Sequence, residues 1–157
     1  MQFQLKKGLT LEEFALRFLT MKNYSHNFKH EVSDFLTEYM EAVARNAVSF
    51  SYEAEKELFK RVWIQINRAL PGGEAFRGKN PSDRRSYGPF SPALFEMVSI
   101  GVAHNIEIVE KLSPEEIGDK ITNLIIKAKA NVLTGSGSNS RSKTVGRLEL
   151  GKAGFTV

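Results

Sequence analysis

The chain has 157 residues, a net charge of +4 and 41% hydrophobic residues, a composition typical of a globular protein with one sizeable core. It has no cysteine, which excludes disulfide frameworks, zinc–thiolate sites and thiol nucleophiles. Because no apolar run approaches the roughly 20 residues that cross a bilayer, and no signal peptide is visible, we expect one cytoplasmic domain, residues 1–157, without a membrane partner.

Helical periodicity runs through most of the chain. Apolar residues recur at spacings of three and four, and no segment alternates apolar and polar residues over the length of a strand. The sequence therefore predicts an all-α fold, a bundle of five to six helices. These cover about 10–21, 28–43, from Ser49 or Ser51 to Leu70, 91–111 and from Ser113 to about Ala128, with a short last helix over 145–155 weakened by Gly146 and Gly151.

Capping signals mark several of the helix starts. Thr10 with Glu13 and Ser113 with Glu116 have the spacing of a capping box, in which a hydroxyl and a carboxylate satisfy the first free N–H groups. Ser91 offers an N-cap before a proline at the first helical position. The helix after Ser91 has few polar positions, so we expect it to be the most buried.

A Pro/Gly-rich hinge joins the third and fourth helices, and its glycines and prolines predict a segment without regular structure. The hinge is basic. It carries four cationic side chains against the single carboxylate of Asp83; the four are Arg77, Lys79, Arg84 and Arg85.

A second basic group lies near the C-terminus, where residues 127–157 hold six lysines and arginines and one glutamate. Arg141, Lys143 and Arg147 stand in or beside a Gly/Ser-rich loop, residues 134–144. Both groups are candidate contacts for nucleic-acid phosphates. The alternatives are that the cations are solvated, pair with the acidic second helix, or bond backbone carbonyls of the hinge.

The stretch Gly137–Thr144 is close to a Walker A loop, but Ser142 replaces the glycine before the lysine. A P-loop also needs a preceding strand and a following sheet, and only 13 residues remain after it. We therefore expect no nucleotide and no other cofactor.

The three histidines do not form a recognisable catalytic or metal-binding motif. His26, His30 and Asp34 have a spacing that places metal-ligand types on one helix face, but such spacings are common and a surface or capping role is expected. His104, inside an apolar helix, is expected to be a hydrogen-bonded core residue. Helical ribonucleases of the HEPN class need an arginine five residues before a histidine, and none of the three histidines has one. No catalytic or metal-binding residue is predicted.

Five landmarks follow one another in a specific order: Leu11–Leu19; Phe28–Lys29 with Phe35–Met40; Glu74–Arg77; Phe90–Glu96; and Thr134–Ser138 with Val145–Leu148. Their order and spacing, over about residues 9–155, resemble the helical C-terminal region of GmrSD-type proteins, domain-of-unknown-function family 262.

The resemblance implies a role in bacterial defence against foreign or modified DNA. In that family, nucleotide hydrolysis belongs to a ParB/sulfiredoxin-like N-terminal domain with an Asp-Gly-Gln-Gln-Arg-like motif, and DNA cleavage to a His-Asn-His domain. This sequence contains neither motif. The resemblance therefore carries over no catalytic residue, and it suggests a dissected domain, a split gene product or a remnant.

The sequence leads to one hypothesis and two alternatives. The chain is expected to be a non-catalytic helical accessory module of a restriction-like, anti-phage defence protein, with a catalytic domain or subunit of the same system as its partner and DNA as a possible ligand. The first alternative is a protein-interaction or dimerisation module without nucleic-acid affinity. The second is a small helical nuclease, which would need an enclosed pocket with convergent titratable groups.

Overall fold

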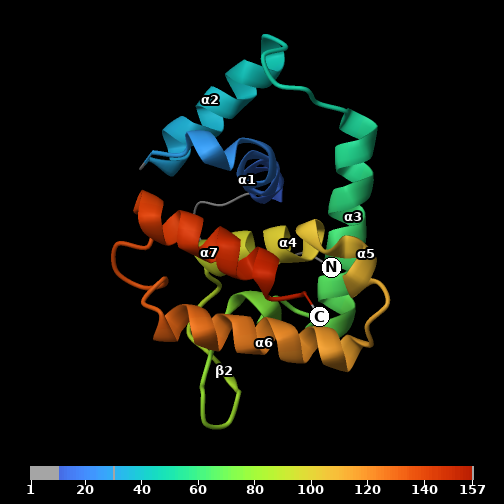
Figure 1. Cartoon of the computed structure of the whole chain (residues 1–157), viewed down its shortest axis with the longest axis vertical. Helices are drawn as coiled ribbons and strands as arrows, with labels where there is room; N and C mark the ends of the chain where they lie inside the picture. The colour runs from blue at the N-terminus through green and yellow to red at the C-terminus, as the bar shows by residue number, and fades with distance from the viewer. Residues whose placement is uncertain (1–10, 30, 157) are drawn as a thin grey trace.

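The computed structural model describes residues 11–29 and 31–156 (Figure 1). Helices dominate these residues, so the predicted all-α class is confirmed in its main feature. The elements in chain order are α1 (Leu11–Tyr24), the 3-10 turn η1 (Ser25–Asn27), α2 (Val32–Ala44), α3 (Tyr52–Ala69), the 3-10 turn η2 (Glu74–Phe76), β1 (Gly78–Lys79), β2 (Ser86–Tyr87), α4 (Pro92–His104), α5 (Ile106–Val109), α6 (Pro114–Ala130) and α7 (Arg141–Ala153).

Serine hydroxyls begin four of these helices. Each accepts a hydrogen bond from a backbone N–H in the first turn, which satisfies a donor that has no partner inside the helix. Ser113 and Glu116 form the predicted capping box, whereas the box predicted at Thr10 lies outside the described residues. The four capping residues are Ser51, Ser91, Ser113 and Ser140.

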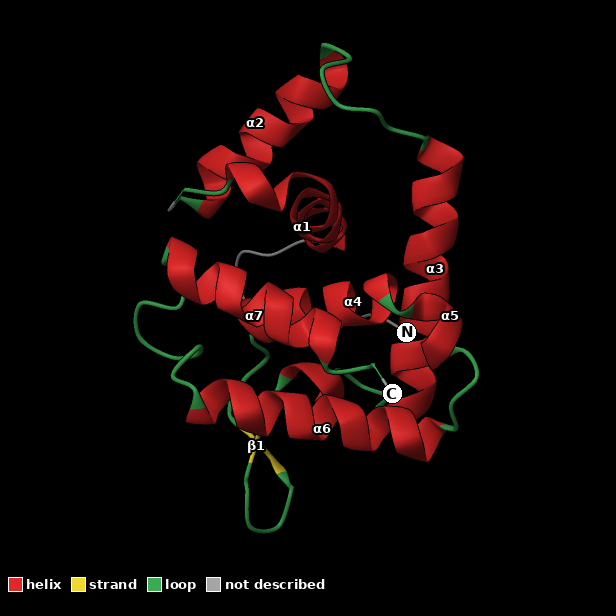
Figure 2. Ribbon diagram, viewed as in Figure 1, coloured by secondary structure: helices red, strands yellow, loops and turns green. Residues whose placement is uncertain are grey.

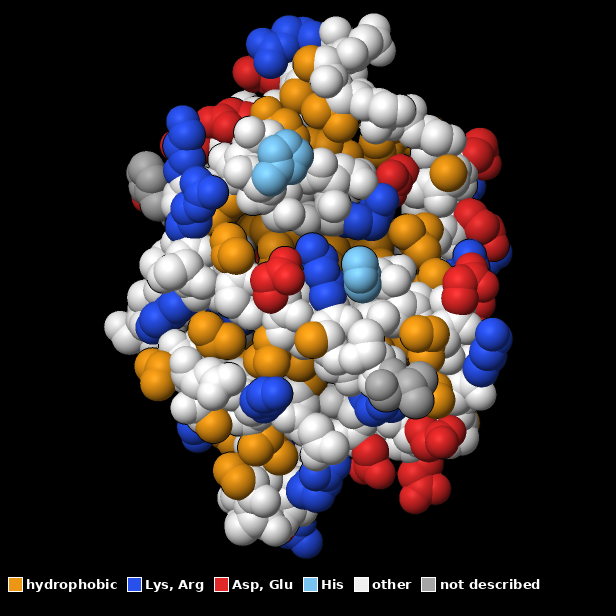
Figure 3. Space-filling model, viewed as in Figure 1, with side chains coloured by type: hydrophobic (Ala, Val, Ile, Leu, Met, Phe, Trp, Pro, Cys, Tyr) orange, Lys and Arg blue, Asp and Glu red, His pale blue; other side chains and the backbone are white. Residues whose placement is uncertain are grey.

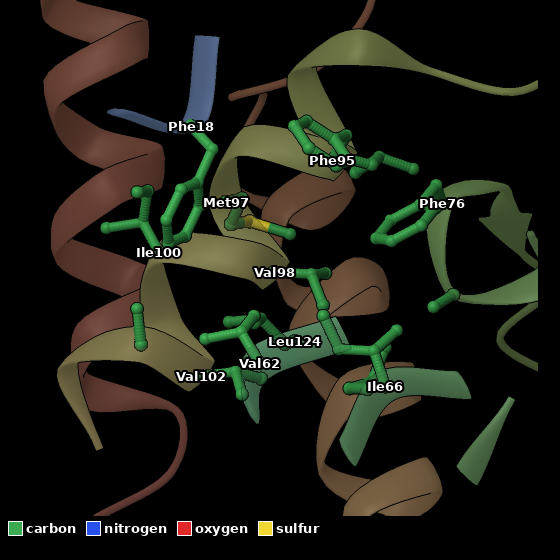
Figure 4. Packing of buried hydrophobic residues seen from close by; sticks show 14 of the residues in the cluster. Phe18, Val62, Ile66, Phe76, Phe95, Met97, Val98, Ile100, Val102 and Leu124 are labelled. Carbon is green, nitrogen blue, oxygen red and sulfur yellow. The ribbon is translucent and has the colours of Figure 1, made fainter. Parts of the chain in front are cut away.

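Helix α4 forms the centre of the molecule. Its residues from Leu94 to Ala103 are all buried, which confirms that this is the most buried helix. In Figure 4 its side chains meet Phe18 of α1, Val62 of α3 and Leu124 of α6. The helix has no polar side facing solvent because α1, α3 and α7 pack around it (Figure 1).

Two glycines allow α4 and α7 to approach more closely than helices with side chains at the contact can. A Cβ added at Gly101 would overlap the carbonyl oxygen of Gly151, and a Cβ at Gly151 would overlap the carbonyl oxygen of Met97. The sequence predicted that Gly151 would weaken the last helix. In the structure, Gly151 is the point at which α7 packs against α4.

Helices α1 and α2 lie above this centre in Figure 1. Helix α2 packs on α1 through aromatic side chains, with the Tyr24 and Phe35 rings stacked and the Phe28 ring edge-on to Phe35 at 5.1 Å. Helix α1 in turn contacts α4. Helix α3 runs along one side and contacts both α4 and α6.

The predicted fourth helix, residues 91–111, is wrong in its length. Helix α4 ends at His104, and α5 is a separate short helix. The side chain of Asn105 explains the break because its Nδ2 donates to the carbonyl oxygens of Gly101 and Lys152, at 2.9 and 2.8 Å. An asparagine that bonds backbone carbonyls in this way competes with the helix ladder.

The hinge was predicted to lack regular structure, and this is also wrong. It contains η2 and a short antiparallel hairpin, in which Gly78 pairs with Tyr87 and Lys79 with Ser86. Glycines and prolines prevent a long ladder, but two residue pairs fit between them. Figure 2 shows the hairpin projecting beyond α6.

Two further helix starts differ from the predicted ones. Helix α2 begins at Val32, and Phe28 is a buried residue just after η1. Helix α7 begins at Arg141 because Ser140 caps it, four residues earlier than Val145. No helix within the described ranges has the length and apolarity that crossing a membrane requires.

We expect Gly101→Ala and Gly151→Ala each to lower the free energy of unfolding by about 3 kcal/mol, the upper end for overpacked cores, because the obstructing atom is backbone. Urea unfolding measures the effect. Gly118→Ala in α6 is the control, since a Cβ there meets neighbours at an ordinary 3.8 Å. Alanine should leave its stability unchanged or raise it by up to about 1 kcal/mol. Equal losses at all three glycines would contradict the close contact.

Candidate nucleic-acid interface

The tip of the hairpin is held by hydrogen bonds within its own loop. The N–H of Asn80 donates to the carbonyl of Arg85 at 2.9 Å, and the N–H of Arg84 donates to the carbonyl of Asn80 at 2.8 Å. The carboxylate of Asp83 accepts from the N–H of Arg85 at 3.0 Å. Asp83, the one acid expected to offset the hinge cations, is thus used to close the loop.

Arg84 and Arg85 are neighbours in sequence, but their side chains make different contacts. The guanidinium of Arg84 donates to Asn123 and Asp119 of α6, at 2.7 and 3.1 Å. Arg84 also has a φ of 62°, in the left-handed region that costs a residue with a side chain about 1–2 kcal/mol. The side chain of Arg85 is exposed and has no hydrogen bond or ion pair with another described residue. Arg85 is therefore free to meet an anion.

The other two hinge cations are bonded to the hinge itself. Arg77 donates to the carbonyl of Gly88 and to the Glu74 carboxylate, both at 2.8 Å. Lys79 is 3% exposed, and its ammonium donates to the Glu74 carbonyl and the Ser86 hydroxyl. Burial lowers the pKa of Lys79. Backbone bonding, one of the alternatives left open by the sequence, describes Arg77 and Lys79, and the buried ammonium of Lys79 does not face solvent.

The cations of the second basic group likewise differ in exposure and in bonding. Arg141 is exposed in the first turn of α7, a turn that contains no acidic residue. Lys143 is half-buried, and its ammonium donates to the carbonyl of Ser136 at 2.8 Å. The Walker A-like stretch is therefore a turn and a helix N-terminus with its lysine folded back onto the loop.

Arg147 is buried, with 1% of its surface exposed, and lies inside the protein. It donates to the carbonyls of Leu133 and Ser138, at 2.8 and 2.6 Å, and so ties the loop before α7 to that helix. Its guanidinium also lies 3.9 Å from the carboxylate of Glu96 on α4. An arginine in this position cannot reach a phosphate at the surface.

Glu96 joins three helices through charge. Arg17 of α1 donates to its carboxylate at 2.9 Å, and Arg147 approaches from α7. Burial raises the pKa of Glu96, and the two guanidinium charges oppose that shift. Burial likewise lowers the pKa of Arg147 against the charge of Glu96. This group is a structural ion network in the core.

The hairpin lies against α6, whose C-terminal half adds two lysines, and a loop leads from α6 to Arg141 and Lys143 at the start of α7. Lys129 donates to the Tyr87 hydroxyl at 2.8 Å, and Lys127 is exposed. Figure 3 shows lysine and arginine side chains where α6 ends and the hairpin projects, with acidic side chains to their right. We call the six cations of the hairpin, the end of α6 and the start of α7 the basic surface: Arg84, Arg85, Lys127, Lys129, Arg141 and Lys143.

Lys127 and Lys129 are not among the cations that the sequence predicted to contact nucleic acid. Lysines in the last turn of a helix are common because they complement its dipole, so their positions alone did not point to a surface. The hairpin contacts of α6 supply the missing information.

The histidines are not gathered into a site. His26 is exposed and pairs with Asn27 at 3.0 Å, while His30 lies outside the described residues. His104 is exposed at the end of α4, so its expected core position is wrong; the helix breaks there and its side chain faces outward. Among the described residues, no group of three histidine, aspartate or glutamate side chains could hold a metal ion.

An apolar groove lies between α1 and the beginning of α3. It has a volume of about 230 Å³ and is lined mainly by apolar side chains, with Tyr52 at its edge 69% exposed. The apolar lining comes from Ala15, Leu19, Phe50, Tyr52 and Phe59.

Comparison of the chain with protein-family models, curated proteins and solved structures found no match. The resemblance to GmrSD-type proteins therefore stays a hypothesis.

Acidification should weaken the hinge through Glu74. Hydrogen bonding to Ser86, and then to Arg77, lowers the pKa of Glu74 below the ordinary 4.5. The folded protein therefore binds fewer protons than the unfolded chain, so this stabilisation is present above pH 4.5 and is lost as the pH falls through the folded pKa. Urea midpoints between about pH 3 and 7 should show Glu74→Gln less stable at neutral pH, with a gap that closes in acid. A gap independent of pH would contradict the assignment.

Glu96→Gln should lower the free energy of unfolding by about 3–5 kcal/mol because it leaves Arg147 buried without a counter-charge. Thermal or urea unfolding measures the loss. Glu107→Gln removes a carboxylate whose side chain is 78% exposed and pairs with Arg61, and should cost less than about 1 kcal/mol. Similar losses for the two variants would show that the core network contributes no more than a surface pair.

Proposed function

We propose that this chain is a non-catalytic helical module that contacts the phosphates of DNA through the basic surface. Lysine and arginine side chains that neutralise phosphates release bound counterions, which is the main source of affinity for nucleic acid. The helical core would hold these cations in fixed positions, and the chemistry would belong to a partner.

The observation that carries the proposal is a long stretch of the chain without acidic residues. No aspartate or glutamate occurs between Asp119 and Glu149. Within that stretch Lys127, Lys129 and Arg141 are exposed, and the free side chain of Arg85 adds a charge from the hairpin. An ordinary solvated surface mixes both signs of charge, whereas residues 120–148 carry cations alone. The acids beside the hairpin cations are Asp83, which bonds the N–H of Arg85, and Asp119, which pairs with Arg84.

The wider role is an accessory module of a restriction-like, anti-phage defence protein in the cytoplasm. The order of sequence landmarks shared with GmrSD-type proteins supports this role. Nucleotide hydrolysis and DNA cleavage are assigned to a catalytic domain or subunit of the same system.

The apolar groove between α1 and α3 favours a second candidate, a protein-interaction module without affinity for nucleic acid. Apolar surface that stays open to solvent commonly marks a place where another protein binds. This candidate makes no use of the basic surface, so charge substitutions there distinguish the two functions.

Removing two exposed cations should weaken DNA binding and flatten its dependence on salt. For Arg85→Ala/Arg141→Ala, the slope of log K against log salt concentration should fall by about 0.9 for each lost phosphate contact. Fluorescence anisotropy with a labelled duplex over a series of NaCl concentrations measures both quantities. Arg84 is kept intact because it also secures the hairpin on α6.

The matched control is Lys60→Ala/Lys111→Ala, which removes the same charge from exposed positions on α3 and after α5. It should leave the slope unchanged. Equal slopes for all three proteins, or no DNA binding by the wild type at low salt, would overturn the proposed function and leave the interaction module.

A further inference from the structure

One exposed aromatic side chain lies within the basic surface. The large exposed aromatic residues of the described chain are Tyr52, Trp63 and Tyr87, and the first two lie on α3. Tyr87, on β2, is 42% exposed and lies beside Lys129. Nucleic-acid bases stack on aromatic rings that lie next to cations, so the position of Tyr87 suits base stacking.

The ring of Tyr87 is held in place at two points. It lies across Gly78 of the paired strand, where an added Cβ would be 2.7 Å from Cζ and 2.9 Å from Cε2. Glycine is therefore required at position 78 for the ring to lie against the strand. At the other end, Lys129 of α6 donates to the phenolic oxygen at 2.8 Å. A ring fixed in this way loses little conformational freedom when a ligand binds.

Lys129 does not cover the ring. Its ammonium is 2.8 Å from the hydroxyl oxygen but 4.8 Å from the ring centre. A cation above the centre would have these two distances in the opposite order, so the ammonium lies beyond the hydroxyl end. The ring lies against Gly78 on one side, and the residue as a whole is 42% exposed.

Arg85 lies on the same side of the hairpin as this ring. The hydroxyl of Ser86 faces inward, because it accepts from the buried ammonium of Lys79. Side chains alternate along an extended arm, so the neighbours of Ser86, Arg85 and Tyr87, both face outward. The ring and Arg85 thus lie on the same side of the hairpin arm, and Lys129 lies at the hydroxyl end of the ring.

We propose that Tyr87 is a stacking platform for an unpaired base of a DNA single strand, with Arg85 and Lys129 meeting the adjoining phosphates. This inference rests on the proposed function and names its substrate class, a strand with exposed bases. In a duplex the base faces are stacked on one another, and a fixed ring at the surface cannot reach them.

The test compares two labelled probes of equal charge and a length of about 15 nucleotides: a DNA single strand and an abasic strand of the same phosphodiester backbone. Wild type should bind the base-containing strand about tenfold more tightly, the scale of one base stacked on an aromatic ring. Tyr87→Leu should bind both probes equally. Tyr87→Phe, which keeps the ring and loses the hydroxyl, should keep most of the preference.

Gly78→Ala provides a second variant that retains the tyrosine but displaces its ring, and it should also lose the preference for bases. Because the hairpin is peripheral to the core, circular dichroism and thermal unfolding should show all three variants folded. If wild type binds both probes equally, or if Tyr87→Leu keeps the preference, stacking is overturned while phosphate binding stands. If wild type binds neither probe nor duplex at low salt, both proposals fail.

Discussion

The close approach of α4 and α7 at Gly101 and Gly151 is the constraint on which the rest of the structure depends. At this point α4 and α7 meet backbone to backbone, and α1, α3 and α6 bury the rest of the apolar surface of α4. The same proximity brings Arg147 from α7 towards Glu96 on α4. A charged network in the core is thus a consequence of helix packing.

Burial divides the cations of this chain into two classes with different structural roles. Lys79 and Arg147 bond carbonyl groups of the loops next to them, which stabilises turns that would otherwise leave buried acceptors without partners. Arg85, Lys129 and Arg141 lie outside, on three separate elements. Because the inner cations order the loops, the outer ones are held at defined positions. The proposed DNA contact depends on both classes.

The hairpin of the hinge packs against α6, and α6 leads on to the second basic group. Arg84 and Tyr87 reach from the hairpin to α6, and α6 leads through a loop secured by Arg147 to the start of α7. Segments far apart in the sequence therefore contribute to one surface. Within the described residues, this charged area is an open surface and not an enclosed pocket.

The sequence by itself determined the helical class and most helix starts. A cap such as Ser113 acts on an N–H only three residues away, so its effect can be recognised from neighbouring residues alone. The burial of α4 followed from its lack of polar positions.

Contacts between distant segments decided the rest. Asn105 ends α4 partly by bonding Lys152, 47 residues later, and Gly151 serves as a contact because Met97 lies opposite it. Of the seven cations predicted to touch DNA, the tertiary structure placed Lys79 and Arg147 inside, and it brought Lys129 of α6 against the hairpin. Charge can be counted in a sequence, but the exposure of a charged side chain depends on which distant segment packs over it.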